Sequence, residues 1–243
     1  MNILKISDFS RKDDLLIKEF KNIKIVFTTA EKNRSFNRFL ENGLNNLESL
    51  KSEFCLNSLN FIKQIHSDYI VSYKGKSIKE EEGDAIITRK VKDGIGVFTA
   101  DCVPVIIFDE ESKSIAAIHS GWKGTIKSIT KKTLEKMIID YNININTTKI
   151  IIGPHIKNCC YEVSDDLKEK FLDTTKIDEK KLFNNRNLNL EECILKDARE
   201  IGILEENIYS LDLCTHCSKE IKLFSYRKSI GTYGRMFSLV FQK

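Results

Sequence analysis

Residues 95–130, IGVFTADCVPVIIFDEESKSIAAIHSGWKGTIKSIT, decide how the chain is expected to fold. This stretch predicts an apolar strand, a turn, a second apolar strand, a Gly-Trp-Lys-Gly turn and the start of a helix. Cys102 stands at a break in the first apolar run, and His119 stands at the end of the second. Two soft metal ligands at strand ends are therefore expected beside a helix N-terminus.

Strand and helix patterns alternate on both sides of this stretch. Runs rich in β-branched and aromatic residues predict strands at residues 23–28, 59–73, 85–89, 150–154, 160–163, 207–217, 222–228 and 236–242. Apolar residues at helical spacing predict helices at residues 36–54, 126–138, 165–172 and 190–201. Ser164 is expected to cap the third helix and Gly202 to end the fourth. We predict an α/β fold of the α+β type, in which residues 1–243 form one domain with a mixed sheet flanked by helices.

The composition bounds the class of protein. The chain has 243 residues, of which 41% are hydrophobic, with 39 Lys and Arg against 35 Asp and Glu. This near balance of charge is not the concentrated basic face that nucleic-acid binding needs. No apolar run approaches the ~18 residues of a membrane span, and no secretory signal is recognisable. We expect a monomeric cytoplasmic protein whose seven cysteines are reduced thiols or metal ligands.

His66, Cys102 and His119 are the first candidate site. Catalytic zinc takes three protein ligands from His, Cys and carboxylate residues and leaves the fourth position for water. The three residues lie far apart in the sequence, so they form a site only if the fold brings them together. The alternative is that Cys102 and both histidines have structural roles in the core. Asp84 or Asp101 is a candidate to orient a ligating imidazole, although Asp84 also suits a plain turn.

Two further patterns suggest an anion site. The glycines around Trp122 and Lys123 allow close approach of a ligand, and the helix expected after them offers free N–H groups to a phosphate. Such strand-to-helix junctions are also common for packing reasons alone. Arg227 and Arg235 stand next to turns, and their guanidinium groups suit phosphate or carboxylate.

Cys214-Thr-His-Cys217 is a C-x-x-C pattern. In a reduced chain this pattern serves either thiol redox chemistry or zinc binding. A structural zinc needs a second ligand pair. Cys159, Cys160 and His155 supply that pair only if the fold brings them close.

Taken together, these motifs resemble the YfiH-type laccase-domain family, also known as polyphenol oxidoreductases and now regarded as purine nucleoside phosphorylases. The resemblance runs from about residue 64 to the C-terminus. The matching stretches are QIHSD, GDAIIT, TADCVPV, AAIHSGWKGT, GPHI, CCYEV, CT, FSYR and GRM. It implies that His66, Cys102 and His119 bind zinc and act in catalysis, and that the substrates are a purine nucleoside and phosphate. We carry Lys123, Arg227 and Arg235 forward as candidate substrate-binding residues.

The chain departs from the family pattern near its N-terminus. The family usually carries an S-T-R-x-G-G-[VS]-S loop after its first strand, whereas this chain has TTAEKNRS, with Ala30 where the arginine would fall. If the arginine helps to bind phosphate or substrate, this chain is weaker, altered in specificity, or dependent on nearby Arg34. The C-terminal turn before Arg235 is also slightly longer than the family's.

The resemblance implies a zinc-dependent purine nucleoside phosphorylase, with adenosine deaminase and methylthioadenosine phosphorylase activity also credited to the family. Three alternatives remain. A copper oxidase fits a His₂Cys set, but a multicopper oxidase needs more imidazoles than the four histidines present. A thiol hydrolase would use Cys102 as nucleophile and His119 as base. A non-catalytic purine-binding protein would explain the altered loop.

Overall fold

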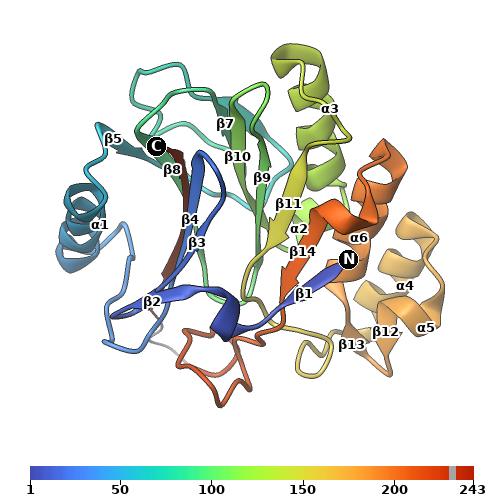
Figure 1. Ribbon diagram of the computed structural model, residues 1–243. Coiled ribbons are helices and arrows are strands. Elements are labelled where there is room, and N and C mark those ends of the chain that lie inside the picture. The colour runs from blue at the N-terminus through green and yellow to red at the C-terminus, as the bar shows by residue number, and fades with distance from the viewer. Residues whose placement is uncertain (230–233) are drawn as a thin grey trace.

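The computed structural model describes residues 1–229 and 234–243. Its secondary structure is built around two main β-sheets, shown in Figure 1 with helices on their outer sides. The seven-stranded sheet has the order β1-β14-β11-β9-β10-β7-β6, and the six-stranded sheet has the order β2-β3-β4-β15-β8-β5. Both sheets mix parallel and antiparallel pairs. The predicted fold class, an α/β chain with mixed sheet structure flanked by helices, is therefore confirmed.

The strands of the seven-stranded sheet are β1 (Asn2–Leu4), β6 (Ile70–Ser72), β7 (Ala85–Thr88), β9 (Val103–Asp109), β10 (Ser114–Ser120), β11 (Lys149–Ile152) and β14 (Ile208–Leu211). Those of the six-stranded sheet are β2 (Ser10–Lys12), β3 (Leu15–Glu19), β4 (Ile23–Thr28), β5 (Ser58–Asn60), β8 (Asp93–Thr99) and β15 (Met236–Gln242). A separate two-stranded hairpin joins β12 (Phe183–Asn184) to β13 (Asn187–Leu188). The helices are α1 (Glu41–Glu53), α2 (Trp122–Thr125), α3 (Ile129–Tyr141), α4 (Asp165–Thr175), α5 (Glu179–Leu182) and α6 (Leu190–Ile201).

Strand alternation explains how the layers stack. In β9, Val105 and Ile107 face the helices, whereas Ile106 and Phe108 face the second sheet. These strands are apolar on both faces because both faces are covered. A third cluster joins the outer face of the six-stranded sheet to Leu47 of α1. The order is therefore helices, sheet, sheet, helix, with α3 and α6 on one side and α1 on the other (Figure 1).

Several predicted elements differ from the structure. The expected strand at 59–73 is two short strands, β5 and β6, because the intervening loop turns at His66, whose φ is +57°. No strand forms at 160–163 or 222–228, where turns and irregular backbone replace it. Helix α1 begins at Glu41 and not at residue 36. The predicted helix at 126–138 begins later, at Ile129, because Ser128 takes a left-handed conformation and separates α2 from α3.

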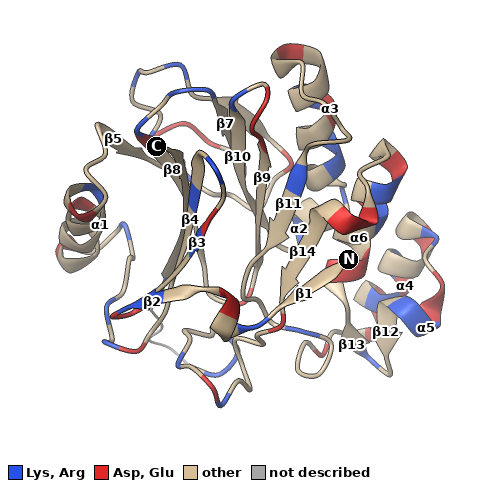
Figure 2. Cartoon of the chain, viewed as in Figure 1, with Lys and Arg blue, Asp and Glu red and all other residues tan. Residues whose placement is uncertain are grey.

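Other expectations are confirmed. The strand at 23–28 is β4, and the last strand is β15. Ser164 caps α4 by accepting a hydrogen bond from the amide of Leu167, and Gly202 ends α6 with a φ of +93°. The turn containing Gly231, expected before Arg235, falls on residues 230–233 and lies outside the described part of the chain. Within the described ranges, no helix has the length and apolar character needed to cross a bilayer. Acidic and basic residues are interspersed along the helices and loops (Figure 2).

Candidate active site

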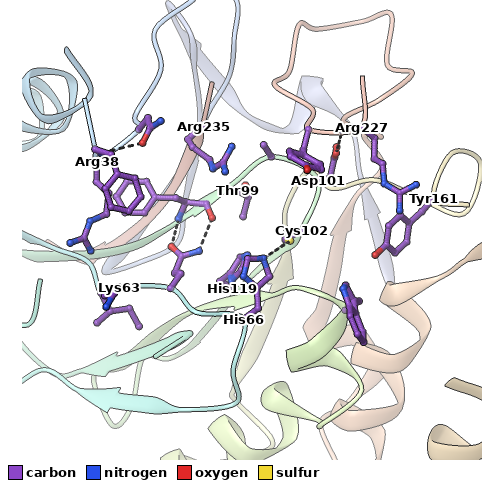
Figure 3. A pocket seen from close by; sticks show the side chains of 18 residues that line it. Arg38, Lys63, His66, Thr99, Asp101, Cys102, His119, Tyr161, Arg227 and Arg235 are labelled. Carbon is purple, nitrogen blue, oxygen red and sulfur yellow. Dashed lines mark hydrogen bonds between the residues drawn. The ribbon is translucent and has the colours of Figure 1, made fainter. Parts of the chain in front are cut away.

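His66, Cys102 and His119 meet in space, as Figure 3 shows, although three different elements carry them. His66 lies in the loop between β5 and β6, Cys102 in the turn between β8 and β9, and His119 near the end of β10. One ligand atom from each residue lies within 4.8 Å of the other two. The break at Cys102 is where the chain leaves one sheet and enters the other, since β8 and β9 belong to different sheets.

Asp84 organises both histidines. Its Oδ1 accepts a hydrogen bond from Nδ1 of His119 at 2.7 Å, which leaves Nε2 of that ring to face Cys102. The same carboxylate accepts the backbone amides of His66 at 3.1 Å and Ser67 at 2.5 Å. Burial alone would raise the pKa of Asp84, but these hydrogen bonds, from His119 first and then Ser67, lower it below its usual value. Asp84 thus fixes the orientation of the His119 ring, as the carboxylate behind a ligating histidine would.

Asp101 has a different role from the one considered for it. Its carboxylate accepts a hydrogen bond from the hydroxyl of Thr215 at 2.6 Å and from the backbone amide of Arg227 at 2.8 Å. It takes a φ of +99°, which is rare for a residue with a side chain. Asp101 therefore fixes the turn that carries Cys102 and does not orient an imidazole.

Gln64 fixes the loop that carries His66. Its side-chain amide donates to the carbonyl of Phe98 at 2.8 Å and accepts from the amide of Phe98 at 2.7 Å. The side chain thus pairs with β8 as another strand would. This explains why a glutamine precedes the histidine by two residues in QIHSD.

Cys102 and His119 polarise one another. Burial raises the pKa of Cys102, but the neighbouring rings of His119 and His66 overcome this and lower that pKa to about 6. Burial lowers the pKa of His119, but Cys102 and Asp84 overcome this and raise it to about 9. The thiolate is thus the favoured form of Cys102, and the thiolate is also the form that binds metal.

The donor set and its spacing fit a metal ion. Zinc bonds of about 2.3 Å to sulfur and about 2.0 Å to nitrogen in a tetrahedron place the two atoms about 3.5 Å apart. Sγ of Cys102 and Nε2 of His66 are 4.0 Å apart, so a small contraction suffices. A Cβ added to Gly121 would meet Cδ2 of His66 at 2.9 Å and Sγ of Cys102 at 3.2 Å. A glycine at position 121 therefore keeps space beside His66 and Cys102.

A cavity of about 470 Å³ opens over these residues. Its lining combines five aromatic rings with four basic side chains, a composition suited to a flat ring system and an anion. The aromatic members are Phe39, Phe98, Trp122, Tyr161 and Tyr226, and the basic members are Arg38, Lys63, Arg227 and Arg235. In Figure 3, Arg227 and Tyr161 lie on one side of His66 and His119, and Arg38 and Lys63 lie on the other.

The predicted substrate-binding residues divide into two groups. Arg227 and Arg235 line the cavity, and the guanidinium of Arg227 stacks 5.1 Å from the ring centre of Tyr161. Lys123 is exposed and lies outside the lining, with its Nζ 5.6 Å from the ring centre of Trp122. Helix α2 has only four residues, so the long helix expected to offer its N-terminus there begins further along the chain.

The altered N-terminal loop is explained structurally. Ala30 is fully buried, and its amide donates to the carbonyl of Lys222 at 2.8 Å. Arg34 makes two hydrogen bonds, of 2.9 and 2.8 Å, to the buried carboxylate of Asp14 and does not line the cavity. Among the described residues it is Arg38, which the sequence patterns did not single out, that adds a guanidinium to the cavity near this loop. Arg38 lies outside every recognisable motif, so no sequence pattern indicated that it faces the cavity.

The chain matches the family model described as multi-copper polyphenol oxidoreductase laccase over residues 39–243. Two similar proteins carry the name purine nucleoside phosphorylase. One from Clostridium acetobutylicum is 41% identical over 100% of both chains. One from Borreliella burgdorferi is 30% identical over 85% of this chain and 87% of its own.

Solved structures share the fold. The Bacillus licheniformis protein YfiH superposes with a TM-score of 0.86 at 23% identity, covering 96% of this chain and 97% of that one. YlmD from Geobacillus stearothermophilus superposes with a TM-score of 0.81 at 19% identity, covering 97% and 99%. From the family match and these relatives, the chain belongs to the multi-copper polyphenol oxidoreductase laccase family, which includes the YfiH-type proteins.

Proposed function

We propose that the chain is a zinc-dependent purine nucleoside phosphorylase. It transfers the ribosyl group of adenosine, inosine, guanosine or methylthioadenosine to phosphate and releases the free base. The observation that carries this proposal is the position of His66, Cys102 and His119 in a cavity that also presents Arg227 and Arg235. The names of the relatives point to the same reaction.

The residues divide the task between them. Phosphate binds to Arg227 and Arg235, since a guanidinium fork matches its oxygens. Phe39 and Tyr226, whose rings are largely exposed at the cavity, hold the purine base by stacking. Lys123 lies outside the cavity lining beside Trp122, so its proposed contact with substrate is at the edge of the cavity. Zinc held by His66, Cys102 and His119 would supply Lewis acidity at the reacting centre.

The proposal is tested by release of free purine base with and without phosphate, using protein whose metal content has been measured. Base release is expected to require phosphate, to disappear in Cys102→Ala and after chelation, and to persist in Cys55→Ala. Cys55 is an exposed cysteine outside the cavity lining, so it controls for loss of a thiol. Metal-loaded protein that turns over none of these nucleosides would overturn the proposal. Ammonia release from adenosine in the same assay tests the accompanying deaminase activity.

One observation favours a second candidate, a hydrolase with Cys102 as nucleophile. The low pKa of Cys102, about 6, and its closeness to His119 are what an activated thiol needs. Metal ligation and nucleophilic attack compete for the same sulfur. Covalent labelling of Cys102 by an acyl substrate during turnover, without any metal requirement, would favour the hydrolase.

The copper oxidase alternative is less well supported. The cavity holds only His66 and His119 of the four histidines. His155 is buried, with Nδ1 2.9 Å from the carbonyl of Gly153 and Nε2 3.5 Å from Glu191. A multicopper cluster needs more imidazoles than the cavity supplies. Turnover of phenols by copper-loaded protein would restore this candidate.

A further inference from the structure

A second group of metal-ligating side chains lies outside the cavity lining. It consists of Cys159, Cys160, Cys214 and Cys217, which we call the cysteine cluster. The four sulfurs lie within 4.8 Å of one another, and those of Cys159 and Cys217 are 3.6 Å apart. All four are free thiols. Tetrahedral zinc with bonds of about 2.3 Å places its sulfurs about 3.8 Å apart, so the pair Cys159 and Cys217 already matches a tetrathiolate site and the others lie within about 1 Å of that spacing.

The first turn brings two adjacent cysteines to the same point. The amides of Cys160 and Tyr161 both donate to the carbonyl of Lys157 at 2.9 Å. Neighbouring side chains point to opposite sides in an extended strand, but not in a turn of this kind. The strand predicted at 160–163 is therefore absent at the place where Cys159 and Cys160 converge.

The second turn aims N–H groups at a sulfur. The backbone amides of His216 and Cys217, together with that of Lys157 from the first turn, lie beside the sulfur of Cys214. Ser218 closes the second turn by donating its amide to the carbonyl of Cys214 at 3.0 Å. N–H groups directed at a sulfur stabilise its thiolate, which is the form that binds metal. This arrangement is what a C-x-x-C zinc loop requires of its backbone.

The main chain holds the two turns side by side. The amide of Thr215 donates to the carbonyl of His155 at 3.0 Å. The amide of His155 in turn donates to the carbonyl of Leu213 at 3.3 Å. The ring of His155 faces Gly153 and Glu191, so this histidine is not a member of the cysteine cluster. The cluster is thus preorganised by backbone hydrogen bonds, with three of its cysteines at least partly accessible to solvent.

Other uses of these thiols fit less well. A thioredoxin-like C-x-x-C opens a helix after a strand, whereas turns follow Cys214 within the described residues. A disulfide needs two sulfurs, but here four converge. A polynuclear iron–sulfur cluster would need its cysteine sulfurs farther apart than a single ion does.

We propose that the cysteine cluster binds one structural zinc ion, separate from the metal proposed for the cavity. The ion joins two turns that contribute to the cavity wall. Tyr161 follows Cys160 and lines the cavity, and Thr215 lies between Cys214 and Cys217 and bonds to Asp101, beside Cys102. This proposal does not rest on the proposed function, because the cluster would bind zinc whatever reaction the cavity performs.

Cobalt titration of Cys102→Ala tests the proposal. This variant lacks the only sulfur ligand of the cavity site, so any sulfur-to-cobalt charge-transfer band reports the cysteine cluster alone. We expect one equivalent of cobalt to give the intense bands of a tetrahedral tetrathiolate ion, and zinc to displace it at one equivalent. Absence of these bands in reduced protein would overturn the proposal, and so would a disulfide between Cys159 and Cys217 in protein purified under reducing conditions.

Metal analysis supplies the second measurement. After dialysis, Cys102→Ala is expected to retain one zinc per chain, and adding Cys159→Ser and Cys217→Ser is expected to remove it. Adding Cys55→Ser instead is the matched control and should leave that zinc in place. Retention of one zinc without Cys159 and Cys217 would count against the cluster. The cobalt titration leaves all four cysteines intact, so it decides the question even if the serine variants fail to fold.

Discussion

The carboxylate of Asp84 lies 2.7 Å from Nδ1 of His119, the distance of a strong hydrogen bond. Asp84 directly precedes β7 and His119 lies near the end of β10, so the two residues meet at the same end of this antiparallel strand pair. The same carboxylate also accepts the backbone amide of His66. One buried acid therefore sets the ring orientation of one proposed ligand and the backbone position of another.

Asp84→Asn is expected to weaken metal binding at the cavity site about 10- to 100-fold, the usual effect of losing a carboxylate behind a ligating histidine. The amide keeps the size of the side chain but loses the charge that orients the imidazole. Competition with a chromophoric chelator measures the affinity. Asp68→Asn is the matched control, because Asp68 lies nearby but pairs with Lys127 and Lys132 instead. Equal metal affinities in the two variants would refute the role of Asp84.

Gly121→Ala is expected to reduce metal affinity and nucleoside turnover together. The new methyl would lie 2.9 Å from His66 and 3.2 Å from Cys102, so one of the two must move. Metal binding is measured by calorimetry, and thermal unfolding of the metal-free protein shows whether the fold survives. Unchanged metal affinity in a folded variant would show that the ligands have more space than the structure gives them.

Motifs predicted the centre of the site but not its surroundings. Cys102 stood out at a break in an apolar run and His119 at the end of the next, and the loop between β5 and β6 brings His66 to them. Arg38, Tyr161 and Tyr226 belong to loops, where no periodicity marks a side chain that faces a cavity. Only the three-dimensional path of those loops assigns them.

The fold was predictable for strands that are buried on both faces and for helices that are buried on one face. The apolar runs of β9, β10 and β15 and the amphipathic pattern of α6 gave clear signals. The strand expected at 222–228 was wrong because the apolar residues Leu223 and Phe224 pack against the inter-sheet core from an irregular segment. The pattern of apolar and polar residues does not distinguish a strand from an irregular segment that packs its apolar side chains against the core.

Arg34 and Arg235 are expected to respond differently to the same substitution. Arg235→Met removes a cation from the cavity and should raise the KM for phosphate about tenfold. Arg34→Met leaves the buried carboxylate of Asp14 without its partner and should lower the free energy of unfolding by about 3 kcal/mol. Steady-state kinetics and urea unfolding of both variants check this. A raised phosphate KM in Arg34→Met alone would show that this arginine serves the substrate.

Asp197 is expected to make stability depend on pH. It is 4% exposed, and burial raises its pKa to about 6. A carboxyl whose pKa is higher in the folded state stabilises the protein most at low pH, and this contribution is lost as pH rises from about 4 to 6. A pKa shift of this size corresponds to a loss of about 3 kcal/mol in the free energy of unfolding. Asp197→Asn should therefore unfold with a higher free energy than the wild type at pH 7 and a similar one near pH 4, whereas the exposed control Asp140→Asn should track the wild type. Urea unfolding across this range measures the difference, and parallel curves for Asp197→Asn and wild type would disprove it.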